Sequence, residues 1–163
     1  MSTRDGGTVK YFAYGSNMST QRLRERTPSA IARGAGYLVG YDLRFHKRST
    51  DGSGKADALY TGRAEDVVWG VVFELAEAEL AALDTAERGY RRVAIDVLAP
   101  RGCLLPGSTV TKAITYLAEA RRIDATLRPF DWYKTHVVDG AREHGLPAEY
   151  LAKIEAVEAR QES

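Results

Sequence analysis

Residues 66–74 read DVVWGVVFE, and this run of valines and aromatic side chains is the strongest strand signal in the sequence. β-Branched and aromatic residues are enriched in strands, and a run of this length suits a strand better than a helix. Residues 75–87 then become rich in Ala, Leu and Glu, which favour a helix. A buried strand that leads directly into a helix is therefore the starting point of the predicted fold.

Weaker strand patterns lie on both sides of this run. The segment VKYFAY (Val9–Tyr14) predicts a buried strand, and the break at Gly15 is followed by a helical pattern over Met18–Arg26, with Asn17 or Ser19 as the N-cap. Alternating apolar residues over Ala30–Arg48 predict one strand, which the glycines within it can kink. We expect a loop over 49–55 and further strands over 58–61, 90–98 and 109–117.

The chain becomes helical after these strands. Pro129 marks the start of a helix, Gly140 and Gly145 are expected to interrupt it, and a last helix is predicted over Ala148–Arg160 after Pro147. Several strands with few intervening helices, followed by terminal helices, predict an α+β fold whose sheet is mostly antiparallel or mixed.

The composition is that of an ordinary folded chain. With 163 residues, of which 44% are hydrophobic, a single domain over 1–163 is expected, with residues 1–8 as a loose end. The single cysteine, Cys103, argues against a disulfide framework and is expected to be a core or surface thiol. We see neither a signal-peptide pattern nor an apolar run near the ~20 residues of a membrane helix, so we expect a cytoplasmic protein without membrane contact.

The charge is unevenly distributed along the chain. Residues 1–50 hold 9 basic and 3 acidic side chains, whereas residues 51–163 hold 14 and 19. Such a split is typical of a basic arm that binds nucleic acid, or of two halves of one domain that complement each other. Apolar strand patterns interrupt the basic residues, so we favour the second interpretation and expect no nucleic-acid partner.

The turn after the first strand is one candidate site. Gly15 lets a ligand approach the main chain, and the N–H groups at the helix start that follows lack intrahelical partners. Such groups can bind a carboxylate or stabilise an oxyanion. The same turn needs no ligand if it only begins a capped helix, and the pattern by itself favours that simpler interpretation.

Glu87 is the second candidate. The predicted helix places Ala76, Leu80, Leu83 and Glu87 on one face, so a carboxyl group occupies a position where the pattern calls for an apolar residue. Burial raises the pKa of a carboxyl group, which suits a general base near neutral pH. Alternatively, the helix has already ended and Glu87 faces water or pairs with a neighbouring arginine. The pattern leaves these two hypotheses even.

Other patterns argue against metal or cofactor chemistry. The sequence contains no CxxC, HExxH or EF-hand motif, so we expect no metal. The segment Gly52–Lys55 is similar to a phosphate-binding loop, but Ala56 stands where a Ser or Thr is required. The aromatic residues Trp132 and Tyr133 fit either the core or the wall of a pocket.

Several of these segments together resemble the γ-glutamylcyclotransferases. The turn YGSN and the downstream LDxxE pattern form a specific combination, and the matches follow the order of the family over nearly the whole chain. The matching segments are YFAYGSNM (11–18), RTPSA (26–30), VWGVVFEL (68–75), LDTAE (83–87), ITYL (114–117) and YKTHVVDGAREHGLPAEY (133–150).

The resemblance implies a small closed mixed β-barrel, flanked by helices, with a cavity at one end. It implies an intramolecular reaction in which the α-amine of a γ-glutamyl compound attacks its own side-chain amide, giving 5-oxoproline and a released amine or amino acid, with no cofactor. Glu87 matches the catalytic glutamate. The residues expected to bind the γ-glutamyl substrate are Tyr11, Phe12, Ala13, Tyr14, Gly15, Ser16 and Asn17, with Tyr90, Tyr116 and Tyr133 as pocket tyrosines.

Two alternatives stay open at this point. A relative that acts on γ-glutamyl amines, for example to remove a γ-glutamyl protecting group in a biosynthetic pathway, would share these residues and differ in the pocket for the leaving group. A non-catalytic binding module could use the same barrel. The expected partner is a small molecule, and the expected assembly is a monomer or a homodimer.

Overall fold

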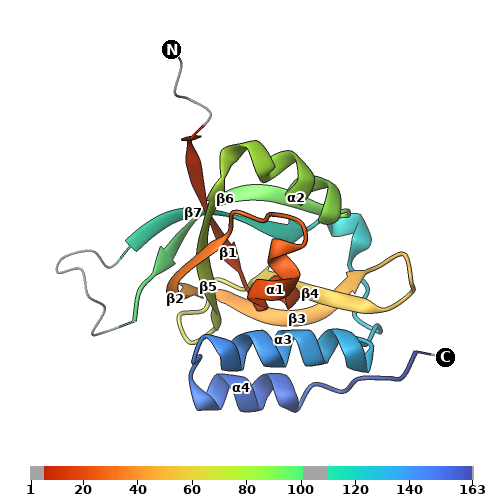
Figure 1. Cartoon of the computed structure of the whole chain (residues 1–163). Helices are drawn as coiled ribbons and strands as arrows, with labels where there is room; N and C mark the ends of the chain where they lie inside the picture. Colours follow the sequence, from red (N-terminus) through yellow and green to blue (C-terminus); the bar gives the residue numbers. More distant parts are fainter. Residues whose placement is uncertain (1–5, 101–109, 163) are drawn as a thin grey trace.

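In the computed structural model, which describes residues 6–100 and 110–162, five strands close into a barrel (Figure 1). Neighbouring strands are antiparallel except at the closure, where β1 runs parallel to β7 and Tyr11 pairs with Ile114. The expected closed mixed barrel is confirmed. In barrel order the strands are β1 (Thr8–Ala13), β5 (Val67–Ala76), β2 (Ile31–Val39), β6 (Tyr90–Leu98) and β7 (Val110–Ala118).

β5 lies between β1 and β2, and it contributes Val68, Val71, Phe73 and Leu75 to the core. The strand is longer than predicted, because Leu75 and Ala76 still pair with β1. Their helix-favouring composition is overridden by these backbone pairings. A 3-10 turn, η3 (Glu77–Glu79), and a short helix, α2 (Leu80–Ala86), follow, so the helix predicted from residue 75 begins only at residue 80.

The single strand predicted over residues 30–48 was wrong. The strand is interrupted at Gly40, whose φ of +87° lies in the left-handed region that favours glycine. The chain then continues as a second strand, β3 (Tyr41–Arg48). β3 pairs with β4 (Gly54–Tyr60) in a separate two-stranded sheet. β4 begins four residues before the predicted Ala58, which shortens the loop between the two strands.

A buried pair attaches this two-stranded sheet to the barrel. His46 Nε2 lies 2.7 Å from Asp57 Oδ2, and the other oxygen of Asp57 accepts a 2.8 Å hydrogen bond from the backbone N–H of Ala118 in β7. Both side chains are buried. Strand β4 is thereby fixed beside β7, and residue 56 next to this pair lies in the cavity described below.

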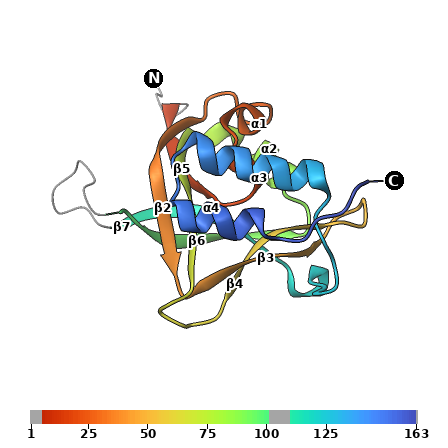
Figure 2. The same ribbon diagram turned by 90° about the horizontal axis from the view of Figure 1, so that it is seen from below.

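The first and the last helix around the barrel are shorter than predicted. After β1, the turn η2 (Ser16–Met18) leads into α1 (Thr20–Arg24), and the Ser19 side chain accepts from Arg22 N–H, which confirms Ser19 as N-cap. After β7 come the turn η4 (Ala120–Arg122) and two neighbouring helices that lie across one face of the barrel (Figure 2). These are α3 (Asp131–Glu143) and α4 (Ala148–Glu155), so the last helix ends five residues before the predicted Arg160.

Gly140 was predicted to interrupt this helix, but that prediction was wrong, because Gly140 lies inside α3. A Cβ at this position would come within 2.6 Å of Met18 Cβ, so glycine allows α3 to approach the η2 turn closely. Gly145, with φ of +66°, does lie in the turn after the helix.

Some sequence predictions fall outside the described residues. Cys103, Thr109 and residues 1–5 are among them. Thr8 already belongs to β1, so the strand begins inside the predicted loose end. Within residues 6–100 and 110–162, we find no helix long and apolar enough to cross a membrane.

Candidate active site

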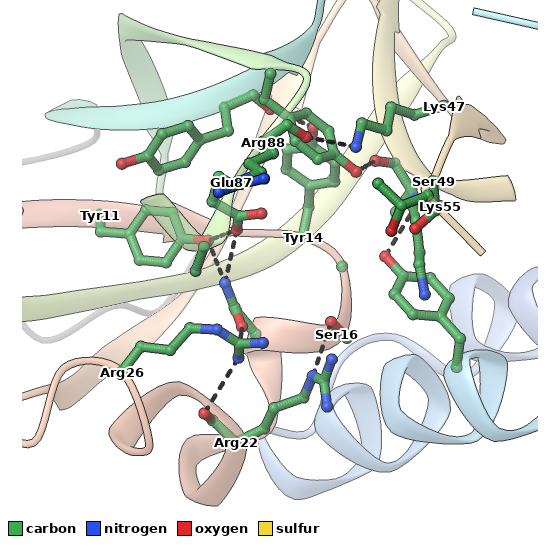
Figure 3. Close-up of a pocket in the computed structure, with 18 residues that line it drawn as sticks. Tyr11, Tyr14, Ser16, Arg22, Arg26, Lys47, Ser49, Lys55, Glu87 and Arg88 are labelled. Carbon is green, nitrogen blue, oxygen red and sulfur yellow. Dashed lines mark hydrogen bonds between the residues drawn. The ribbon is translucent and has the colours of Figure 1, made fainter. Parts of the chain in front are cut away.

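A cavity of about 210 Å³ lies where β1 leads into the η2 turn and where α2 ends (Figure 3). Its lining residues come from β1, the η2 turn, α1, β3, β4, the end of α2, β6, β7 and α3, so most elements of the chain contribute to its wall. The lining residues are Tyr11, Tyr14, Gly15, Ser16, Asn17, Arg22, Arg26, Lys47, Ser49, Thr50, Lys55, Ala56, Ala86, Glu87, Arg88, Tyr90, Tyr116 and Tyr133.

Glu87 reaches this cavity from the C-terminal end of α2. It is the C-cap residue, and its N–H donates to Leu83 O at 3.0 Å. Both sequence hypotheses were therefore partly right: the helix has ended at Glu87, yet the side chain faces the cavity. Asp84, one turn earlier, is exposed and pairs with Arg92 instead.

Asn17 contacts the Glu87 carboxylate directly. Its Nδ2 lies 2.8 Å from Glu87 Oε1 and 3.1 Å from the hydroxyl of Tyr11. On the other side, Arg26 Nη1 donates to Asn17 Oδ1 at 3.4 Å. Because a guanidinium can only donate, it keeps the amide oxygen on its own side and the amide nitrogen toward the carboxylate.

The electrostatic environment of Glu87 has two opposing parts. Burial is the larger effect and raises the pKa of the carboxyl group, whereas the positive charges of Arg26 and Lys47 lower it. The net shift is upward. Burial also raises the pKa of Tyr133, to about 12, which keeps its hydroxyl neutral.

The turn at residues 15–17 packs tightly into the site. A Cβ on Gly15 would lie 3.1 Å from Ala56 Cβ and 3.2 Å from the Tyr133 hydroxyl, so only glycine fits without displacing a neighbour. Within the turn, the first N–H groups that donate to backbone carbonyls are those of Met18 and Ser19. The N–H groups of Ser16 and Asn17 precede them, at the position where helix-like turns offer donors to a ligand.

The three pocket tyrosines expected from the resemblance all line the cavity. The peptide groups of Ala56 hold two of them: its N–H donates to the Tyr133 hydroxyl at 3.0 Å, and the Tyr90 hydroxyl donates to its C=O at 2.6 Å. The Tyr116 hydroxyl donates to Asp84 at 2.5 Å. By contrast, the side chains of Phe12 and Ala13 are buried in the core and are not among the residues that line the cavity.

Sequence reasoning missed the basic side chains of the cavity. Arg22, Arg26 and Lys47 come from the basic first fifty residues, and Lys55 comes from the segment that was compared with a phosphate-binding loop. Lys47 lies over the Tyr90 ring, 4.6 Å from its centroid, and donates to the backbone C=O of Arg88. The uneven charge of the sequence was the signal that could have found them. Basic side chains from residues 1–50 line the same cavity as the carboxylate of Glu87, which comes from the acidic residues 51–163.

This geometry can be compared with known proteins. The AIG2-like family matches residues 67–154. The chain is 30% identical to γ-glutamylcyclotransferase of Bos taurus over 97% of its own length and 83% of that protein, and 31% identical to the Mus musculus enzyme over 95% and 81%. A solved structure of a γ-glutamyl cyclotransferase superposes with a TM-score of 0.83 at 28% identity, covering 96% of this chain and 92% of that one.

The barrel fold and the match over residues 67–154 thus place the chain in the AIG2-like family. Within it, the chain belongs to the γ-glutamylcyclotransferase family.

Proposed function

We propose that this enzyme converts a γ-glutamyl compound into 5-oxoproline and a free amine or amino acid, with Glu87 as the general base and acid. The observation that carries this proposal is the position of the Glu87 carboxylate: partly buried in the cavity wall, with Asn17 Nδ2 at 2.8 Å. The names of the relatives support the γ-glutamyl cyclisation itself.

The proposed reaction needs one proton carrier. The α-amine of the substrate attacks the γ-carbonyl carbon, so a new C–N bond closes a five-membered ring. Glu87 takes a proton from the attacking nitrogen and returns it to the leaving nitrogen as the original amide bond breaks. Because its pKa is raised, the carboxylate is a stronger base than an exposed glutamate, and its protonated form is available at a higher pH.

The turn at Gly15 supplies the matching electrostatics. In this proposal the N–H groups of Ser16 and Asn17 face the substrate and stabilise either the tetrahedral oxyanion or the α-carboxylate. The guanidinium of Arg22 lies beside them, because its Nε donates to Ser16 Oγ at 3.2 Å. The pocket tyrosines hold the substrate in its folded conformer, and this positioning contributes to the rate because the reaction is intramolecular.

The decisive experiment replaces Glu87 by Gln, which keeps an oxygen that can accept the Asn17 hydrogen bond. We expect 5-oxoproline formation from γ-glutamyl-alanine, measured by mass spectrometry, to fall by about 10²–10⁴-fold. Calorimetry should show that 5-oxoproline still binds. The matched control is Glu77→Gln, at an exposed position before the same helix, which should retain wild-type turnover.

Two results would contradict the proposal. Near-normal turnover by Glu87→Gln would remove Glu87 from the mechanism. A wild-type protein that binds 5-oxoproline but releases no product from any γ-glutamyl compound would instead be a binding module.

A further inference from the structure

Lys55 has a constrained position at the edge of the cavity. Its ammonium lies 4.3 Å from the centroid of the Trp132 ring and 4.3 Å from that of the Tyr133 ring. The side chain is 13% exposed. Two aromatic faces hold a flexible lysine in one place, so little side-chain entropy remains to be lost when it binds an anion.

Asp51, the acidic neighbour of Lys55, does not use the full hydrogen-bonding capacity of the Lys55 ammonium. Asp51 Oδ2 lies 3.6 Å from Lys55 Nζ, which is longer than the ~2.7–2.9 Å of a charge-assisted hydrogen bond. The other oxygen of Asp51 accepts from both the N–H and the hydroxyl of Ser53, at 2.9 and 2.5 Å. An ammonium has three donors, so Lys55 retains the capacity to bind a carboxylate in the cavity.

Lys55 also lies across the cavity from Glu87. Figure 3 shows Glu87 and Tyr11 on one side, Ser49 and Lys55 on the other, and Ser16 between them. If the glutamyl group is folded beside Glu87 and the turn at Ser16, the leaving group extends toward Lys55. The Trp132 ring, which contacts the Lys55 ammonium, is 38% exposed.

The charge of the cavity agrees with a second carboxylate on the ligand. Arg22, Arg26, Lys47 and Lys55 line it together with Arg88, against the single carboxylate of Glu87 among its described lining residues. The α-carboxylate of a glutamyl group complements part of this positive charge. A leaving group with its own carboxylate would complement Lys55 as well, whereas a simple amine would not.

We propose that Lys55 forms a carboxylate subsite for the leaving group and makes the enzyme prefer γ-glutamyl amino acids to γ-glutamyl amines. This inference rests on the proposed function. It assigns to Lys55 the discrimination between the two substrate classes, and to the Trp132 and Tyr133 rings the task of positioning its ammonium.

The test compares two substrates that differ by one carboxylate, γ-glutamyl-alanine and γ-glutamyl-ethylamide. Wild type should have the higher kcat/KM on γ-glutamyl-alanine. Lys55→Met should lower that value by about 10–100-fold, while the value for the ethylamide falls by less than about 3-fold. Lys55→Arg, which keeps the charge, should restore part of the preference. Lys112→Met, at an 82% exposed lysine of β7, is the control and should behave as wild type.

Each outcome has a separate meaning. Equal losses on both substrates would overturn the inference, because Lys55 would then act on the shared glutamyl group or on the fold. An unchanged preference in Lys55→Met would overturn it as well. If wild type cyclises neither substrate, the proposed function itself fails, and this result is distinguishable from both others.

Discussion

Asn17 and Glu87 are seventy positions apart in the sequence, yet Asn17 Nδ2 lies 2.8 Å from Glu87 Oε1. The contact joins the turn after β1 to the end of α2. Because Asn17 is itself oriented by Arg26, the carboxylate has one favoured orientation in the cavity. The two parts of the site suggested by the sequence, the glycine turn and the glutamate, are therefore one hydrogen-bonded unit.

Replacing Asn17 by Ala should impair turnover and shift its pH dependence. The amide donor stabilises the ionised form of Glu87, so its removal raises the pKa of the carboxyl group further. We expect kcat to fall by about 10–100-fold at pH 7. The acid limb of the kcat profile should move to higher pH, which a titration of rate from pH 5 to 9 would reveal. An unmoved limb would show that the contact does not act on the base.

Glu87→Gln should make the folded protein more stable at neutral and higher pH. The pKa of Glu87 is raised in the folded state, so its contribution to stability is fully present below its unfolded pKa and is lost as the pH rises through the folded value. Glutamine avoids that loss because it does not ionise. Each kcal/mol gained in this way would raise the Tm by about 2–4 °C in a chain of this size. Thermal melts between pH 5 and 8 should show the difference growing with pH, and a difference that shrinks would contradict this expectation.

Gly15→Ala should reduce activity while the chain still folds. The new methyl group would press on Ala56 Cβ and on the Tyr133 hydroxyl at 3.1–3.2 Å, so the tyrosine or the turn has to move by a few tenths of an ångström. Displacements at a reacting centre are costly, and we expect a loss of about 10–100-fold in kcat/KM. Gly6→Ala, where a Cβ meets nothing within 4 Å, is the matched control. Circular dichroism and turnover measured side by side would separate the two effects.

Asp57→Ala should destabilise the whole chain. It removes the acceptor for His46 and for the Ala118 N–H, leaving both buried donors without a partner. Each buried donor left without a partner costs about 1–3 kcal/mol, which urea unfolding would measure. The exposed Asp139, also replaced by Ala, should change the free energy of unfolding by less than about 0.5 kcal/mol. Similar values for the two variants would argue against a structural role for the buried pair.

The strands were largely predictable because their signal is local. The alternation over Tyr90–Leu98 gave the bounds of β6, and the run at residues 66–74 located β5. The errors arose where non-local contacts decide the outcome. Leu75 and Ala76 have helical composition but pair with β1, and Gly140 is a favourable helix residue only because Met18 packs against it.

The candidate site was predictable in part. Glu87 could be singled out because its position in the pattern called for an apolar residue, and the turn at Gly15 because glycine permits close approach. The sequence could not indicate that Lys55 faces the same cavity, because that depends on how β4 attaches to the barrel and on the rings of α3. The glycines that precede Lys55 in the sequence indicated a loop, but they did not indicate which residues Lys55 contacts.

The parallel contact between β1 and β7 has a consequence for the synthesis of this chain on the ribosome. The first strand stays without its second neighbour until residue 114 has been made, and Tyr133 follows later still. Pairings this distant in sequence form slowly. A nascent chain that already carries Tyr11, Asn17 and Glu87 thus still lacks the walls that exclude water from them, and the cavity is completed only after residue 133 has been made.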